Sequence, residues 1–213
     1  MKIALINEDS QASKNEIIYN TLKDVAGRKN HEVINFGMYD QDDKRLTYVQ
    51  NGLLTAVLLN GGLVDFVVTG CGTGEGAMLA CNSFPNVVCG HVTNPLDSYL
   101  FSQVNGGNAI AIPFAQNFGW GAELNLEQIF EQLFKDEFGG GYPVERREPE
   151  QANAKILDGV KEVTHKDIYY ILENLDREFV KNTLDRESFK DYFFENCKDE
   201  KLVEIVRGIL GSE

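Results

Sequence analysis

Residues 64–82 read Val-Asp-Phe-Val-Val-Thr-Gly-Cys-Gly-Thr-Gly-Glu-Gly-Ala-Met-Leu-Ala-Cys-Asn. The valine-rich start is typical of a buried strand, predicted here over Val64 to Val68. Four glycines follow within residues 70–76, and the spacing after them predicts a short helix near Ala77 to Asn82. A strand that passes through a glycine-rich turn into a helix is the repeating unit of a parallel α/β sheet.

The same alternation of strands and helices continues on both sides of this segment. Further strands are predicted over residues 2–6, 31–36, 87–89 and 108–112, and helices over residues 10–26, 46–59, 95–103 and about 124–138. Strands alternating with helices form right-handed crossovers in one parallel sheet. We therefore predict an α/β fold: a Rossmann-like, doubly wound parallel sheet of about five strands.

The composition changes after residue 149. Residues 150–213 contain three glycines and no proline, and apolar residues such as Ile168, Ile171, Leu172 and Leu175 recur at helical spacing. The dense aromatic residues of this segment predict packing against the main domain or a second subunit. We expect an α/β domain over residues 1–149 and an all-helical C-terminal extension over residues 150–213.

Charge and composition exclude several classes of function. The chain has 213 residues, with 20 Lys and Arg against 33 Asp and Glu, a formal net charge of −13. Such acidity disfavours nucleic acid and anionic membranes as partners. No apolar run approaches the roughly 18 to 20 residues of a membrane helix, and the four cysteines lack the spacing of a zinc site. We expect a cytoplasmic protein without structural disulfides.

The glycine-rich turn is the part of the sequence that carries chemistry. Its glycines allow several backbone N–H groups to point at one anionic atom, and the following helix adds the positive end of its dipole. A loop that stabilises negative charge suits Cys71 as a base or nucleophile, with Glu75 as the alternative base. The simpler interpretation is an ordinary tight turn that contains a cysteine. The dinucleotide fingerprint is matched only loosely, and a Walker ending is absent.

At this turn the sequence resembles the type B ribose-5-phosphate isomerase family, which includes the galactose-6-phosphate isomerase subunits. The likeness continues through Asn105-Gly-Gly-Asn-Ala-Ile-Ala and covers roughly residues 1–150. It implies aldose–ketose isomerisation of a sugar phosphate through a cis-enediolate, without a metal or cofactor. It also implies a homodimer or tetramer in which active sites are shared between subunits.

The resemblance assigns roles to individual residues. Cys71 matches the usual base of the family, and a subset of members uses a glutamate at the position of Glu75. Thr73 and the amides of Gly72 and Gly74 match the groups that bind the developing enediolate.

Three further residues match positions that contact the substrate. Asn105 matches an asparagine that contacts sugar hydroxyls or the enediolate, and Tyr48 matches a tyrosine that lines the pocket. Arg146 matches one of two arginines that hold the phosphate, and it is the residue expected to serve the site of a neighbouring subunit.

The chain departs from the family at several positions. Glu8 and Asp9 replace an Asp-His pair, Val104 stands in place of the histidine that helps to open the sugar ring, and Tyr142 replaces the first phosphate arginine. A substrate that is already acyclic or lacks a phosphate would fit these losses, and His91 and Arg147 are the nearest substitutes for the missing groups. Glu8 and Asp9 are expected either to bind sugar hydroxyls or to cap the helix that begins near Ser10.

Two other classes of function compete with an isomerase. A non-catalytic subunit or sugar-phosphate sensor would keep the fold and the anion-binding loop. A cysteine hydrolase would need a histidine partner, and no histidine has a suitable spacing.

Overall fold

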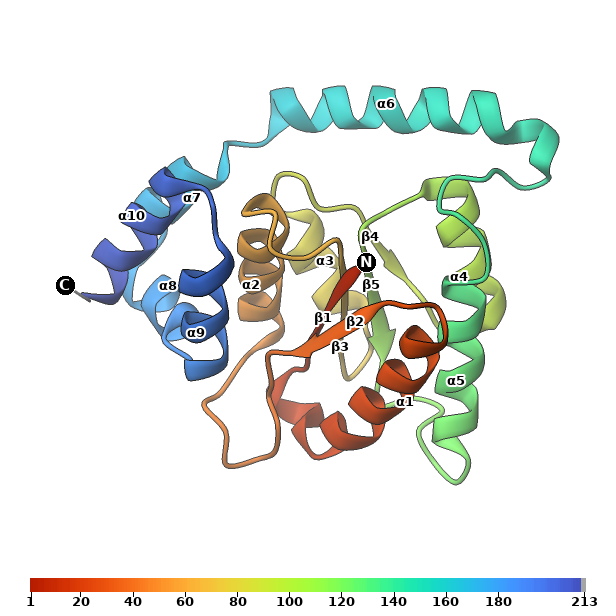
Figure 1. The fold of residues 1–213 in the computed structure, drawn as a ribbon, viewed down its shortest axis with the longest axis horizontal. Coiled ribbons are helices and arrows are strands. Elements are labelled where there is room, and N and C mark those ends of the chain that lie inside the picture. Colours follow the sequence, from red (N-terminus) through yellow and green to blue (C-terminus); the bar gives the residue numbers. More distant parts are fainter. Residues whose placement is uncertain (212–213) are drawn as a thin grey trace.

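The computed structural model describes residues 1–211 (Figure 1). It contains one five-stranded sheet in the order β2-β1-β3-β5-β4, and all pairs are parallel. The strands are β1 (Lys2–Ile6), β2 (Glu32–Asn35), β3 (Phe66–Cys71), β4 (Cys89–His91) and β5 (Ala109–Pro113). Every residue of β3 and β5 is buried, as expected for central strands covered on both faces. The predicted doubly wound fold is confirmed.

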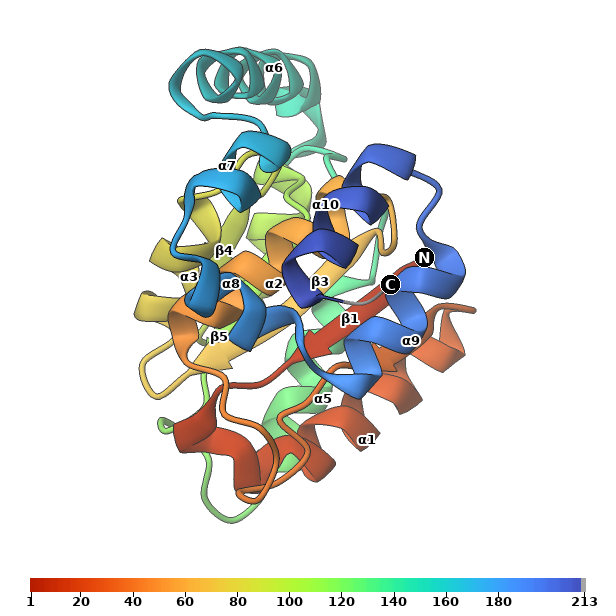
Figure 2. The ribbon, with the colours of Figure 1, turned by 90° about the vertical axis from the view of Figure 1, so that its left-hand side faces the viewer.

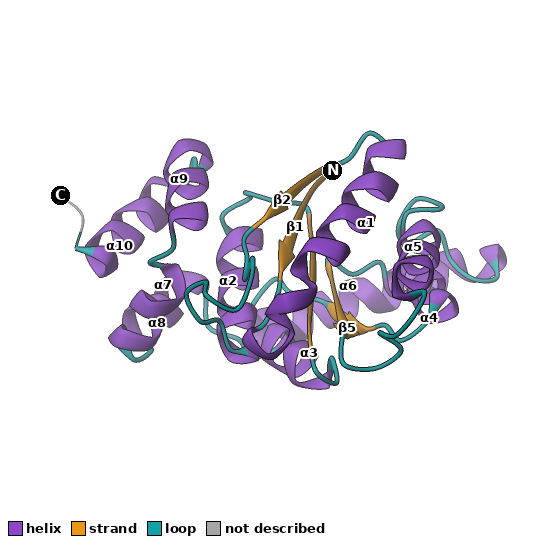
Figure 3. Ribbon diagram, turned by 90° about the horizontal axis from the view of Figure 1, so that it is seen from below, coloured by secondary structure: helices purple, strands orange, loops and turns teal. Residues whose placement is uncertain are grey.

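Helices cover both faces of the sheet. Figure 3 shows α1 (Asn15–Arg28) and α5 (Ala122–Leu133) on one side and α2 (Tyr48–Asn60) on the other. The short helix α3 (Glu75–Asn82) packs with α2, and α4 (Pro95–Leu100) packs with α5. Two apolar clusters result, one on each face, because alternate residues of each strand point to opposite sides.

Several predicted boundaries shift in the structure. β3 runs on to Cys71, so Gly70 and Cys71 belong to the strand and pair with Ile112 and Pro113 of β5. The expected strand over 87–89 lies two residues later, and the expected helix to residue 138 ends at Leu133.

Two predicted helices are each divided into two segments. The one from Ser10 starts as a 3-10 helix, η1 (Asp9–Lys14), before α1 begins. The one over 95–103 continues beyond α4 as a π-helical turn, η2 (Phe101–Asn105).

The described part of the C-terminal extension is entirely helical, as predicted, and the last two residues of the expected range lie outside the described residues. Its helices are α6 (Arg147–Thr164), α7 (Ile168–Asn174), α8 (Arg177–Leu184), α9 (Glu187–Asn196) and α10 (Glu200–Leu210), and η3 (Val144–Arg146) precedes them. The expected boundary at 149/150 falls inside α6.

The last four helices pack on the outside of α2 (Figure 1, Figure 2). α2 is therefore enclosed between the sheet and the extension, and it is buried from Gln50 to Leu59. This explains its almost uninterrupted apolar sequence, since a helix that is apolar all round is a buried one.

α6 runs along one side of the α/β domain (Figure 1), where Lys161 donates a hydrogen bond to the Val87 carbonyl and Gln151 donates to the Gly139 carbonyl. None of its 18 residues is buried. Within residues 1–211, no helix is both long and apolar enough to cross a membrane.

Candidate active site

The strand order places a topological switch point between the ends of β1 and β3. From β1 the chain continues outward to β2, whereas from β3 the sheet extends the other way to β5 and β4. Ligands of doubly wound sheets bind at the carboxyl ends of the strands on either side of such a switch point. Ile6 of β1 pairs with Thr69 of β3, so the residues that follow each strand meet at this edge.

The residues after β3 form the glycine-rich loop. The carbonyl groups of this loop take part in hydrogen bonds within the chain. The carbonyls of Cys71 and Gly72 accept hydrogen bonds from Phe114 and Ala115, at 2.9 and 3.0 Å. The Thr73 carbonyl lies 2.9 Å from His91 Nε2. Because these carbonyls are occupied, the amide N–H groups at the start of α3 are the groups available to an anionic oxygen.

Cys71 and Glu75 lie on either side of this loop. Cys71 ends β3, and its side chain is 6% exposed within the apolar cluster under α2 and α3. Glu75 is exposed in the first turn of α3, where the helix dipole favours a negative charge. Tyr48 begins α2 and packs against this first turn at Gly76. The loop residues, both base candidates and Tyr48 are thus brought together.

Glu8 and Asp9 follow β1 at the same edge. The Glu8 carboxylate is 7% exposed and accepts a hydrogen bond from the Ser10 hydroxyl at 2.8 Å. Burial raises the pKa of Glu8. Burial also acts to raise the pKa of Asp9, but the hydrogen bonds from Arg45, Glu8 and the Ser10 backbone, together with the charge of Arg45, outweigh it and the pKa is lowered. The pKa values of these two adjacent carboxyl groups are therefore shifted in opposite directions.

Asn105 and Arg146 lie elsewhere in the chain. Asn105 ends η2, shortly before β5 begins, whereas Cys71 pairs with the last residue of β5. Five residues of strand span roughly 16 Å, so Asn105 stands at the opposite edge of the sheet. Arg146 is exposed at the end of η3, next to the segment that hydrogen-bonds to η2 through Gly141. A single chain does not bring these two residues to the Cys71 loop.

His91 and Arg147, the residues named as substitutes for the missing family residues, lie in different parts of the structure. His91 lies beneath the loop and hydrogen-bonds with the Thr73 carbonyl, so it contributes to the site as a support of the loop. Arg147 donates to the Gly140 carbonyl at 2.7 Å, beside Arg146 and away from Cys71.

Arg45 is a candidate site residue that the sequence interpretation missed. Its guanidinium forms an ion pair with Asp9. One signal in the sequence points to it: no Lys or Arg stands between Arg45 and Lys135, although this stretch supplies β3, β4, β5 and the glycine-rich loop.

The backbone of the loop makes a prediction about its glycines. Gly74 has a φ of +76°, and a Cβ there would lie 2.8 Å from His91 Nε2 and 2.9 Å from the Pro113 nitrogen. A Cβ on Gly72 would meet nothing nearer than 3.8 Å. We expect Gly74→Ala to lower the free energy of unfolding by about 1–3 kcal/mol, and Gly72→Ala to change it by less than about 0.5 kcal/mol. Urea unfolding of both variants checks this, and equal losses would contradict the loop geometry.

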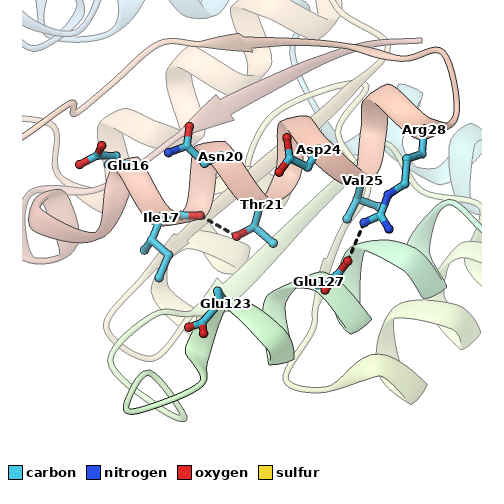
Figure 4. A pocket seen from close by; sticks show the side chains of 9 residues that line it. All are labelled: Glu16, Ile17, Asn20, Thr21, Asp24, Val25, Arg28, Glu123 and Glu127. Carbon is cyan, nitrogen blue, oxygen red and sulfur yellow. Dashed lines mark hydrogen bonds and ion pairs between the residues drawn. The ribbon is translucent and has the colours of Figure 1, made fainter.

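A separate groove lies between α1 and α5 (Figure 4). It measures about 440 Å³ and is lined by the carboxylates of Glu16, Asp24, Glu123 and Glu127, with Arg28 as its cation. The Arg28 guanidinium is engaged by Glu127 at 2.7 Å. No group of three His, Cys, Asp or Glu side chains in residues 1–211 could hold a metal ion. An acidic groove on this face is unsuited to an anionic substrate.

Comparisons with known proteins identify the family of this chain. The model of the family described as Ribose/Galactose Isomerase matches residues 3–148, and one described as Ribose-5-phosphate isomerase matches residues 163–209. A search of the curated proteins gave no match.

Two solved structures match nearly the whole chain, each with a TM-score of 0.96. A 4-deoxy-L-threo-5-hexosulose-uronate ketol-isomerase complexed with a tartrate is 59% identical, over 99% of this chain and 100% of that one. A ribose-5-phosphate isomerase from Vibrio parahaemolyticus is 48% identical, over 99% of both chains. The type B ribose 5-phosphate isomerase from Trypanosoma cruzi is 16% identical over 76% of this chain and 99% of that one, with a TM-score of 0.64, a likeness of fold alone. The chain belongs to the ribose/galactose isomerase family of aldose–ketose isomerases.

Proposed function

We propose that this protein is a ketol-isomerase of an open-chain, unphosphorylated uronate, of which 4-deoxy-L-threo-5-hexosulose-uronate is the example. The observation that carries the proposal is the 59% identity to an isomerase of that substrate along the whole chain, C-terminal extension included.

The chemistry of such a substrate matches the residues that this chain lacks. A 4-deoxy-5-hexosulose has no hydroxyl on C4 and a ketone at C5, so its C1 aldehyde cannot close the usual five- or six-membered sugar ring. An enzyme for this compound has no need of the ring-opening histidine, and Val104 stands at that position. A carboxylate also carries less charge than a phosphate, so it requires fewer cationic donors, and Tyr142 replaces an arginine.

The loop geometry supports an enediolate mechanism. A base removes the proton from C2, the electron pair of that C–H bond forms the C1–C2 double bond, and O1 becomes negatively charged. The amides of Gly72 and Gly74 and the Thr73 hydroxyl stabilise the charge on O1. Return of the proton to C1 and transfer of the O2 hydroxyl proton to O1 complete the ketone at C2.

Cys71 is the base favoured by its position. It ends β3 directly before the loop that binds O1, and it is almost fully buried there. Glu75, which is exposed on the far side of the loop, remains the alternative base.

A second copy of the chain completes the site in this proposal. Asn105 and Arg146 lie too far from Cys71 to serve the site of their own chain, so a partner subunit would supply them. The face of α6 that follows Arg146 exposes Ile156, Leu157, Val160 and Val163 at helical spacing. An apolar stripe of this kind suits a self-complementary contact between two copies. We therefore propose a homodimer or tetramer, and the free cysteines support a cytoplasmic location for it.

The 48% identity to the Vibrio enzyme favours a sugar phosphate as the second candidate substrate. Comparison of kcat/KM for the uronate, ribose 5-phosphate and galactose 6-phosphate decides between the two. We expect the uronate to be preferred by at least about 100-fold, because the site has fewer cationic donors than a phosphate requires. A preference for either sugar phosphate would contradict the proposed substrate.

A further inference from the structure

The edge of the sheet at the ends of β1 and β3 is rich in carboxylates and poor in cations. Glu8 and Asp9 follow β1 at this edge, and Glu75 begins α3 after the glycine-rich loop. Such a site repels an anionic substrate unless a cation offsets the field. Two cations of the same chain stand at this edge, Lys14 and Arg45.

Lys14 is already occupied by internal contacts. Its ammonium donates to Gln11 Oε1 at 2.6 Å and to the Phe114 carbonyl, and it lies over the Phe118 ring. Burial lowers the pKa of Lys14. These contacts connect η1 to the end of β5, so Lys14 has a structural role.

Arg45 is placed differently. Its side chain is 76% exposed, and its Nε is the atom that contacts Asp9. Among the described residues, the structure records no partner for its two Nη groups. The planar guanidinium can therefore bind a second carboxylate along its Nη edge while Asp9 fixes its orientation.

The main chain is fixed on both sides of Arg45. On one side, Leu46 is fully buried and its carbonyl accepts the Asp9 N–H at 2.8 Å. On the other side, Asp43 and Lys44 are held by the C-terminal extension. Arg186, which lies between α8 and α9 and is 4% exposed, contacts Asp43 Oδ2 at 2.6 Å and donates to the Lys44 carbonyl.

Two further contacts hold Asp43 and Lys44 in place. Lys44 Nζ donates to the Asp185 carbonyl at 2.7 Å. Asp43 Oδ2 also accepts the Tyr39 N–H at 3.0 Å, which closes the loop on itself. The C-terminal extension therefore fixes the two residues immediately before Arg45, although Arg186 is about 140 residues from them in the chain.

We propose that Arg45 binds the carboxylate of the substrate and that Arg186 is the positioning residue through which the C-terminal extension holds Arg45 at the site. The inference rests on the proposed function, since it assigns the residue that recognises the anionic end of the uronate. It gives the extension a role in substrate affinity.

The test uses the full-length protein and steady-state kinetics with 4-deoxy-L-threo-5-hexosulose-uronate. We expect Arg45→Ala to raise KM by about 10- to 100-fold and to change kcat by less than about 3-fold, because it removes charge-assisted hydrogen bonds to a group remote from C1 and C2. Arg186→Lys is expected to raise KM by about 3- to 10-fold, since an ammonium cannot hold Asp43 and the Lys44 carbonyl in the same fork.

The double variant separates positioning from a general loss of structure. If Arg186 acts through Arg45, then Arg186→Lys has no further effect on KM in the Arg45→Ala background. Arg177→Lys is the matched control, because the Arg177 guanidinium donates to the Gly208 carbonyl within the extension and does not touch the loop. We expect it to leave KM unchanged. Should Arg186→Lys fail to fold, Asp43→Asn removes the other half of the ion pair and carries the same expectation.

Three outcomes would overturn the inference. An unchanged KM in Arg45→Ala contradicts the role of Arg45, and an equal rise of KM on Arg186→Lys in both backgrounds contradicts positioning. A wild-type protein that does not turn over the uronate contradicts the proposed function and this inference together, and that result is recognised before any variant is measured.

Discussion

Cys71→Ala is expected to reduce kcat with the uronate by about 10²- to 10⁴-fold, because it removes the base that transfers the proton between C2 and C1. KM is expected to change little, since the thiol contacts the reacting carbons and not the carboxylate end of the substrate. Stopped-time assays of ketone formation measure the loss.

Glu75→Gln and Cys81→Ala are the control variants for this experiment. Glu75→Gln keeps the size of the alternative base and removes its charge, and we expect it to retain at least about a tenth of wild-type kcat. Cys81 is a fully buried cysteine of α3 whose thiol approaches Thr55. Loss of activity in Cys81→Ala equal to that in Cys71→Ala would point to a packing effect. Loss in Glu75→Gln with activity kept in Cys71→Ala would assign the base to Glu75.

Mixing two inactive variants is expected to restore activity, if the site is shared between subunits. Asn105→Ala should reduce kcat by about 10²- to 10³-fold, since it removes a donor to the enediolate or the adjacent hydroxyls. A dimer of one Cys71→Ala chain and one Asn105→Ala chain would have one site with both residues intact. Random reassociation makes half of the dimers mixed, so about a quarter of wild-type activity should return.

The control is the same mixture without reassociation, obtained by omitting the dissociating step. Activity no greater than the sum of the separate variants would contradict a shared site, as would sedimentation of the wild-type protein as a monomer. An Asn105→Ala variant with full activity would contradict the role of Asn105.

The sheet could be predicted from the sequence because most of its strands are short apolar runs separated by helices of regular period. The boundary errors occurred where tertiary pairing overrides local signals. Gly70 suggests a turn, yet it continues β3 because its missing side chain lets the Ile112 carbonyl approach closely. The helix from Ser10 starts as a 3-10 segment because the Asp9 N–H bonds to the Leu46 carbonyl, a contact that no local pattern encodes.

Part of the candidate site could be predicted because its residues are close together in the sequence. The loop from Cys71 to Glu75 is contiguous, so its residue types and spacing are visible in the sequence. The placement of Arg45 depends on Arg186 and Asp9, which are distant in the chain. The separation of Asn105 from Cys71 depends on their lying at opposite ends of β5. Neither of these long-range placements produces a periodic pattern in the sequence.

The most direct test of the account is to incubate the wild-type protein with 4-deoxy-L-threo-5-hexosulose-uronate in D2O and to follow the product by NMR. The enediolate mechanism predicts conversion to the C2 ketone with deuterium at C1, because the base exchanges its proton with solvent before returning it. Ribose 5-phosphate under the same conditions should be converted at least about 100-fold more slowly. Absence of conversion of the uronate, or a product without deuterium at C1, would contradict the account.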